Sequence, residues 1–182
     1  SGAAGELLLR HSIGEPFDSR PVVSRGNVWI ATRSGRLVIV DLESGASSGY
    51  LQLPQGLRVG PAFDSKGRVL YQLGENSNLY VISIDTNECR EVLYLGHEPE
   101  SIRVAPLAVS PYLFVAENSG ASDSVLHVLL TDDAGLSVRP AQASAPMPGH
   151  VLTPPVASGR TLVAASDRHA QHALPRSLAS GR

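Results

Sequence analysis

One stretch near the amino-terminal end decides the fold: Pro21-Val22-Val23-Ser24-Arg25-Gly26-Asn27-Val28-Trp29-Ile30-Ala31. It consists of a proline, two apolar residues, a short turn and an apolar strand. The same order returns at Pro61, Pro106 and Pro155. These prolines lie 40, 45 and 49 residues apart (61−21, 106−61 and 155−106). Repeats of about 40–50 residues are typical of chains in which each repeat builds one structural unit, so we predict four copies of one unit.

Each of the first three copies predicts four short strands, because segments rich in Val, Ile, Leu and Tyr are separated by turns that contain Gly, Asp, Ser or Asn. In the first copy we expect strands near 20–23, 27–32, 37–42 and 49–53. The matching strands after the proline-led one are expected at 68–73, 79–84 and 91–95 in the second copy, and at 112–116, 124–130 and 136–139 in the third. The predicted fold is all-β, with about four β-propeller blades of four antiparallel strands.

The phasing of the copies predicts the domain organisation. We expect a lone strand at 6–13, blades at about 14–53, 54–98 and 99–143, and a partial blade at 144–175 that lacks a clear third strand. In one interpretation the lone strand completes the last blade and closes a small ring. In the other, which we favour because the last copy fades, the chain is a segment of a larger ring of about six to eight blades.

A family resemblance supports this architecture. The first unit, with its turn at Gly35-Arg36 and its ending in Asp41-Leu42-Glu43-Ser44-Gly45, resembles a pyrroloquinoline-quinone-type (PQQ-like) propeller repeat. The resemblance covers about residues 6–165 and implies a periplasmic or extracytoplasmic location. Quinoprotein dehydrogenases of that kind hold their cofactor with a vicinal cysteine pair and a calcium ligand set. This chain has a single cysteine, Cys89, so we do not carry the cofactor over with the fold.

Composition excludes several classes of function. The chain has 15 basic and 17 acidic residues and a net charge of −2, without the basic excess of a nucleic-acid-binding surface. No apolar run approaches the roughly 20 residues of a membrane-spanning helix. A lone cysteine cannot form an intrachain disulfide. Apart from Lys66, every basic residue other than histidine is arginine, which points to a GC-rich bacterial source.

Motifs that might support catalysis or metal binding have simpler explanations. His169 and His172 are the only histidines close in sequence, and we expect a solvated tail there rather than a metal site. Gly45-Ala46-Ser47-Ser48-Gly49 has the spacing of a nucleophile elbow. That motif requires a strand-to-helix turn, whereas this segment joins two predicted strands. We therefore predict no catalytic residues, no metal-binding residues and no cofactor, and the sequence assigns no residue to cofactor binding.

Three arginines are the candidate binding residues. Arg58 and Arg103 each lie three residues before an anchoring proline, and Arg20 lies one residue before Pro21. In a propeller the proline-led strands line the central channel, so these side chains are candidates for binding a small anionic ligand or an acidic peptide. The alternative is a repeated structural salt bridge or solvent-facing arginines.

The sequence leaves three functions open. The first is a non-catalytic ligand- or protein-binding propeller module of a larger bacterial protein. The second is a partial domain of a quinoprotein-type dehydrogenase. The third is a sensor or scaffold domain attached to a kinase or a membrane protein.

Overall fold

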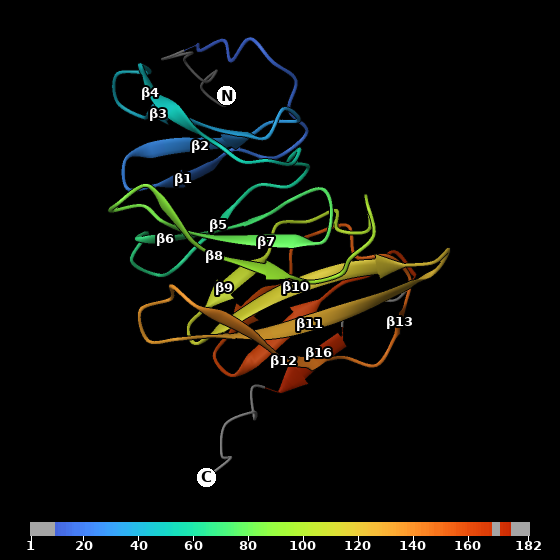
Figure 1. The fold of residues 1–182 in the computed structure, drawn as a ribbon. Coiled ribbons are helices and arrows are strands. Elements are labelled where there is room, and N and C mark those ends of the chain that lie inside the picture. The colour runs from blue at the N-terminus through green and yellow to red at the C-terminus, as the bar shows by residue number, and fades with distance from the viewer. Residues whose placement is uncertain (1–9, 169–171, 176–182) are drawn as a thin grey trace, which may run out of the picture.

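The computed structural model describes residues 10–168 and 172–175, which form four antiparallel sheets (Figure 1). The first sheet contains β1 (Val22–Ser24), β2 (Asn27–Ala31), β3 (Arg36–Asp41) and β4 (Ser47–Gln52). The second contains β5 (Ala62–Phe63), β6 (Val69–Leu73), β7 (Asn78–Ser83) and β8 (Glu88–Tyr94). The third contains β9 (Leu107–Val109), β10 (Tyr112–Ser119), β11 (Asp123–Thr131) and β12 (Val138–Ala143), with β13 (Met147–Pro148) paired to β11. The fourth contains β14 (Val156–Ser158), β15 (Thr161–Ala164) and β16 (His172–Pro175).

All regular elements in the described part of the chain are strands, and none of its segments is a helix long and apolar enough to cross a membrane. In each of the first three sheets, four consecutive strands pair in chain order. The predicted all-β class and its units of four antiparallel strands are therefore confirmed. The limits of the blades along the chain stay a prediction.

At both ends of the chain the strands differ from those predicted from the sequence. The sequence shows no clear third strand in the last copy, but β16 pairs with β15 and places Leu174 opposite Leu162. Its residues, His-Ala-Leu-Pro, are not strong strand formers, so pairing along the neighbouring strand defines this element rather than local propensity. Residues 6–9 of the lone strand expected at 6–13 lie outside the described residues. The remaining four, Arg10 to Ile13, are not in a strand.

The hydrophobic core lies between consecutive sheets. Because side chains alternate along a strand, each sheet has a forward face toward the next sheet in the chain and a backward face toward the preceding one. Trp29, Ala31 and Leu37 on the forward face of the first sheet pack against a second-sheet backward face that includes Leu70 and Ile82. A second cluster joins the second and third sheets, and another joins the third and fourth.

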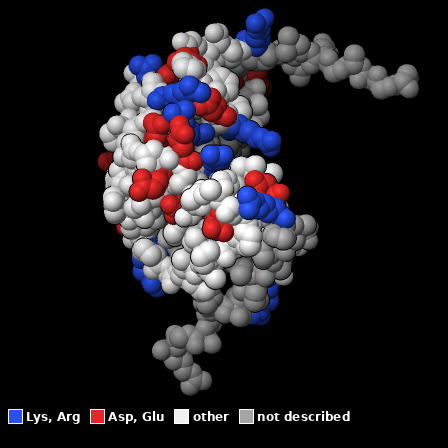
Figure 2. All heavy atoms as spheres, turned by 90° about the vertical axis from the view of Figure 1, so that its right-hand side faces the viewer, with Lys and Arg blue, Asp and Glu red and all other residues white. Residues whose placement is uncertain are grey.

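The sheets follow one another from the first, at the top of Figure 1, to the fourth at the bottom. Figure 2 shows that the resulting outline is a crescent, hollowed on one side. Among the described residues, no hydrophobic cluster contains side chains of both the first and the fourth sheet. The two ends of the crescent therefore do not share a core.

Candidate functional site

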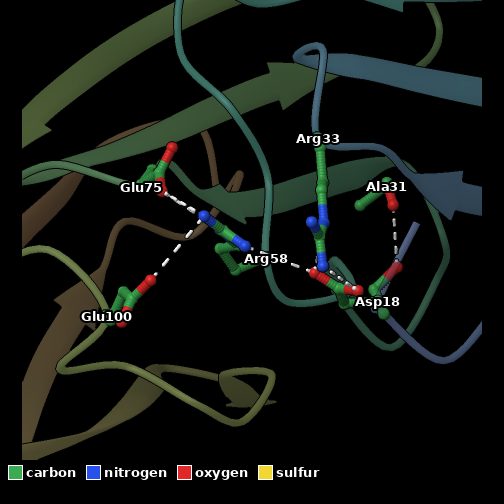
Figure 3. Close-up of polar contacts among 7 residues, drawn as sticks. Asp18, Ala31, Arg33, Arg58, Glu75 and Glu100 are labelled. Carbon is green, nitrogen blue, oxygen red and sulfur yellow. Dashed lines mark hydrogen bonds and ion pairs between the residues drawn. The ribbon is translucent and has the colours of Figure 1, made fainter. Parts of the chain in front are cut away.

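A group of charged residues lies where turns between strands of the first two sheets meet the segments that lead into the first three sheets. We call it the Arg58 cluster, and Figure 3 shows its members converging from separate segments. They are Asp18 before β1, Arg33 between β2 and β3, Arg58 before β5, Glu75 between β6 and β7, and Glu100 before β9. The repeated connection between sheets brings these segments together.

Two arginine–carboxylate pairs form the centre of the cluster. Arg33 donates from Nε and Nη2 to the two carboxylate oxygens of Asp18, at 2.7 and 2.8 Å. Arg58 donates from Nε and Nη2 to Oε1 of Glu75, at 3.0 and 2.8 Å. Such pairing of a planar guanidinium with a carboxylate fixes geometry as well as charge. Each pair thus joins the segment before the first strand of a sheet, β1 or β5, to the turn between the second and third strands of that sheet.

Arg58 links the two pairs to each other and to the third sheet. Its Nη1 lies 3.4 Å from Oδ2 of Asp18, and its Nη2 lies 3.7 Å from Oε1 of Glu100. The Asp18 segment is itself anchored, because Ser19 Oγ donates to the backbone carbonyl of Ala31 at 3.0 Å (Figure 3). One guanidinium therefore connects three consecutive sheets.

The charges of the cluster do not make a basic patch. Three carboxylates face two guanidinium groups, and Figure 2 shows basic and acidic side chains lying side by side on one face of the molecule. The hydrogen bond from Arg33 lowers the pKa of Asp18, and the hydrogen bond to Glu75 raises the pKa of Arg58. Both shifts favour the charged forms. The donors of Arg58 are thus already directed at carboxylates of the chain itself.

The three arginines singled out from the sequence have different surroundings. Arg103 lies next to the cluster, with its Nε 3.5 Å from the backbone carbonyl of Glu100, so Arg58 and Arg103 share one neighbour. Arg20 is exposed, and no ion pair of its side chain occurs within the described residues. The backbone carbonyl oxygen of Arg20 lies beside Gly60, in the second repeat of the chain. Arg58 and Arg103 thus both contact Glu100, whereas no contact of the Arg20 side chain with Glu100 occurs among the described residues.

Sequence reasoning missed Asp18, Arg33, Glu75 and Glu100, although a signal was present. Asp18 and Arg58 both lie three residues before an anchoring proline, and Arg33 and Glu75 both lie two residues after the second strand of their sheet. The Asp18–Arg33 pair of the first copy is therefore the Arg58–Glu75 pair of the second with the charges exchanged. Comparing charges between copies, rather than looking for one repeated residue type, would have found it.

This exchange of charges gives a prediction. Asp18→Arg should lower the urea midpoint of unfolding, because it places a third cation beside Arg33 and Arg58. Adding Arg33→Glu should recover about half of that loss or more, since the double variant reproduces the arrangement of Arg58 and Glu75 in the second copy. The measurement is urea unfolding followed by circular dichroism. A double variant no more stable than Asp18→Arg alone would contradict the pairing.

A second polar group contains the residue types of a hydrolase but not the arrangement. His127 Nε2 lies 2.7 Å from Oε2 of Glu117, and Ser101 Oγ lies 3.4 Å from the other carboxylate oxygen. Ser101 also donates to the backbone carbonyl of Glu98 at 2.8 Å. In a catalytic triad the histidine stands between the acid and the nucleophile. Here the carboxylate stands between serine and histidine, so the group is not arranged to activate Ser101.

The residues present do not fit a quinone cofactor of the kind that the resemblance implies. Cys89 lies on β8 with much of its surface exposed; its thiol donates to the backbone carbonyl of Glu91, and partial desolvation of the sulfur raises its pKa. Within residues 10–168 and 172–175, no group of three or more His, Cys, Asp and Glu side chains could hold a metal ion. His169 lies outside the described residues, and only the backbone of His172 is described.

Comparison with known proteins supports the fold. No family model and no curated protein matches the chain. Among solved structures, BamB from Moraxella catarrhalis is similar over 94% of this chain and 53% of its own, with a TM-score of 0.73 and 14% identity. The computationally designed Ika4 protein is similar over 94% of this chain and 98% of its own, with a TM-score of 0.71 and 13% identity.

A chain of the mitotic checkpoint complex is similar over 82% of this chain and 45% of its own, with a TM-score of 0.63 and 11% identity. The chain thus spans about half the length of two of these three structures. At such low identities the likenesses establish a fold of the β-propeller type and nothing about activity.

Proposed function

We propose that the chain is a non-catalytic, protein-binding β-propeller module of a larger bacterial protein. A propeller-type fold is a platform whose function depends on the surface it presents. One of the similar chains belongs, by its name, to a multiprotein assembly, the mitotic checkpoint complex. In the Arg58 cluster the guanidinium donors are engaged by carboxylates, which favours a protein partner over a small anionic ligand at Arg58.

The observation that carries the proposal is an apolar surface at the outer strands of the second and third sheets. A cavity of about 330 Å³ lies between β8 and β12. We call this surface the rim patch; its apolar members, which line the cavity, are Tyr94, Leu95, Leu129 and Pro140. Tyr94 is exposed. Exposed tyrosine beside an apolar groove is a combination enriched at protein interfaces.

Photo-crosslinking from the rim patch tests the proposal. A photoreactive phenylalanine analogue replaces Tyr94 in cells that naturally produce the protein, and the adducts are identified by mass spectrometry. We expect one discrete protein adduct, lost when Pro140→Glu places a charge in the patch. The control carries the same analogue at Tyr50, which is exposed on β4 outside the groove. Identical adducts from both positions, or none from Tyr94, would contradict a partner at this patch.

The larger protein is tested separately. An antibody raised against the chain should detect, in extracts of the same cells, a polypeptide clearly heavier than 19.2 kDa. A single native band at the mass of the chain itself would remove this part of the proposal.

A further inference from the structure

One position of the repeat has a different environment in the first copy. Four residues before each anchoring proline stand Phe17, Leu57, Ile102 and Val151. The last three are 0%, 6% and 1% exposed, and each belongs to the cluster between its own sheet and the preceding one. Phe17 is 43% exposed. The same position is thus buried wherever a preceding sheet is present, and open where none is described.

The innermost strand shows the same difference. Val23 of β1 pairs with Val28, and Phe63 of β5 pairs with Leu70, so Val23 and Phe63 occupy equivalent positions on the backward face. Phe63 packs edge-on against Trp29 of the preceding sheet, with ring centroids 5.5 Å apart. Val23 is exposed. Val23 therefore stands at a position that packs against the preceding sheet in the second repeat, but among the described residues no preceding sheet contacts it.

Next to Val23, the backward face of the first sheet is apolar; part of it is covered by the segment that contains Ile13, and part borders a cavity. Ile30, Val38 and Val40 form a cluster of their own, against which Ile13 packs. A cavity of about 540 Å³ lies beside them, lined in part by Ile13 and Phe17. A buried apolar face of this type normally packs against another layer of secondary structure.

The opposite end of the crescent presents the complementary face. Val156 of β14 follows its anchoring proline directly, as Ala62 of β5 does. Ala62 is 8% exposed in the core between the second and third sheets, whereas Val156 is 61% exposed. Its pairing partner Val163 stands at the position held in the first sheet by Trp29. The forward face of the fourth sheet therefore lacks a following sheet within the described residues.

We propose that a second copy of this chain occupies both faces. The backward face of the first sheet of each copy packs on the forward face of the fourth sheet of the other, so that two crescents close one ring of eight sheets. The contact repeats the one that joins consecutive sheets within the chain. The chain superposes on 53% of the length of BamB with a TM-score of 0.73, so a fold of this type can continue for about as many residues again. Head-to-tail contacts of this kind close when the rotation between copies allows it.

Glutamate substitutions at the two faces test the proposal on the 182-residue chain. Light scattering should give the unmodified chain a mass of twice 19.2 kDa, and Val23→Glu and Val156→Glu should each reduce it to one copy. Both side chains are already exposed, so neither change should prevent folding, which circular dichroism verifies. Val92→Glu, a change of the same kind on the outer strand β8, is the matched control and should leave the dimer intact.

Mixing the two variants identifies the geometry. Each variant retains the face that the other has lost, so an equimolar mixture should regain a two-copy species that neither variant forms alone. An association through identical faces would instead survive in at least one single variant. A chain that stays monomeric at every concentration, or that grows into filaments, would overturn the proposal. The masses of the variants and of their mixture do not depend on the rim patch. They therefore test the dimer independently of the proposed protein-binding function.

Discussion

Trp29→Ala should lower the free energy of unfolding by about 3–5 kcal/mol, the cost typical of removing a large buried aromatic side chain. Trp29 is buried on the forward face of the first sheet, where it contacts Phe63 edge-on and belongs to the cluster with Leu37, Leu70 and Ile82. Its removal leaves a cavity between two sheets that hold each other by this cluster. The measurement is urea unfolding monitored by circular dichroism.

Trp29→Phe is the matched control. Among the described residues the buried indole Nε1 has no hydrogen-bond partner, so the phenylalanine loses part of the ring and removes an unsatisfied donor. We therefore expect a much smaller loss than for alanine. Equal losses for Phe and Ala would mean that the shape of the indole, rather than buried aromatic volume, holds the first and second sheets together.

The consequence of a cavity at this position follows from the repeat architecture. Each sheet contacts only its neighbours in the chain, so stability is distributed over successive interfaces. The cluster around Trp29 is the interface between the first and second sheets, and Leu57 before β5 also belongs to it. Weakening it should loosen the first sheet while leaving the interface between the third and fourth sheets in place. Hydrogen exchange of β2 and β3 should therefore increase more than that of β15.

The backbone architecture was predictable because local signals agree with the pairing. The prolines at 21, 61, 106 and 155 each precede a short inner strand, and the apolar segments after them form the second strands of the four sheets. Alternation along β2 and β6 determines which side chains face the next sheet. Pattern and turn chemistry thus suffice for strand order, whereas β16 depends on pairing with β15 and has no comparable signal of its own.

The Arg58 cluster was only partly predictable, because it depends on register between copies. The recurrence of arginine before Pro61 and Pro106 pointed to a shared site, and Arg58 and Arg103 do approach Glu100. The first copy has Asp18 at that position, paired with Arg33. A search for one repeated residue type cannot detect a position at which complementary charges are exchanged. The pairing becomes evident only when turns distant in sequence are placed beside each other.

Tyr71 occupies in the second sheet the position that Trp29 occupies in the first, and its environment gives the second large prediction. The side chain is buried, and its hydroxyl donates to the backbone carbonyl of Gly135 at 2.8 Å. Burial raises the pKa of Tyr71 far above 10, and the nearby carboxylates of Asp64 and Asp132 raise it further. The folded protein therefore holds the phenol in its protonated form more tightly than the unfolded chain does.

Because the folded-state pKa is raised, the contribution of Tyr71 to stability is fully present below the unfolded pKa of about 10 and is lost as the pH rises above it. Folding then opposes ionisation of this phenol, and stability should fall by up to about 1.4 kcal/mol for each pH unit above 10. Urea midpoints measured between pH 8 and about 11 should decline steeply in the unmodified chain.

Tyr71→Phe separates this effect from general alkaline unfolding. At pH 8 it should cost about 1–2 kcal/mol, because the carbonyl of Gly135 loses its donor in a buried place. Above pH 10 the variant should lose stability more slowly than the unmodified chain, so that the difference between them shrinks or reverses. Tyr94→Phe, at an exposed position, is the control and should follow the unmodified chain. Parallel pH profiles for the unmodified chain and Tyr71→Phe would show that the buried phenol does not control alkaline stability.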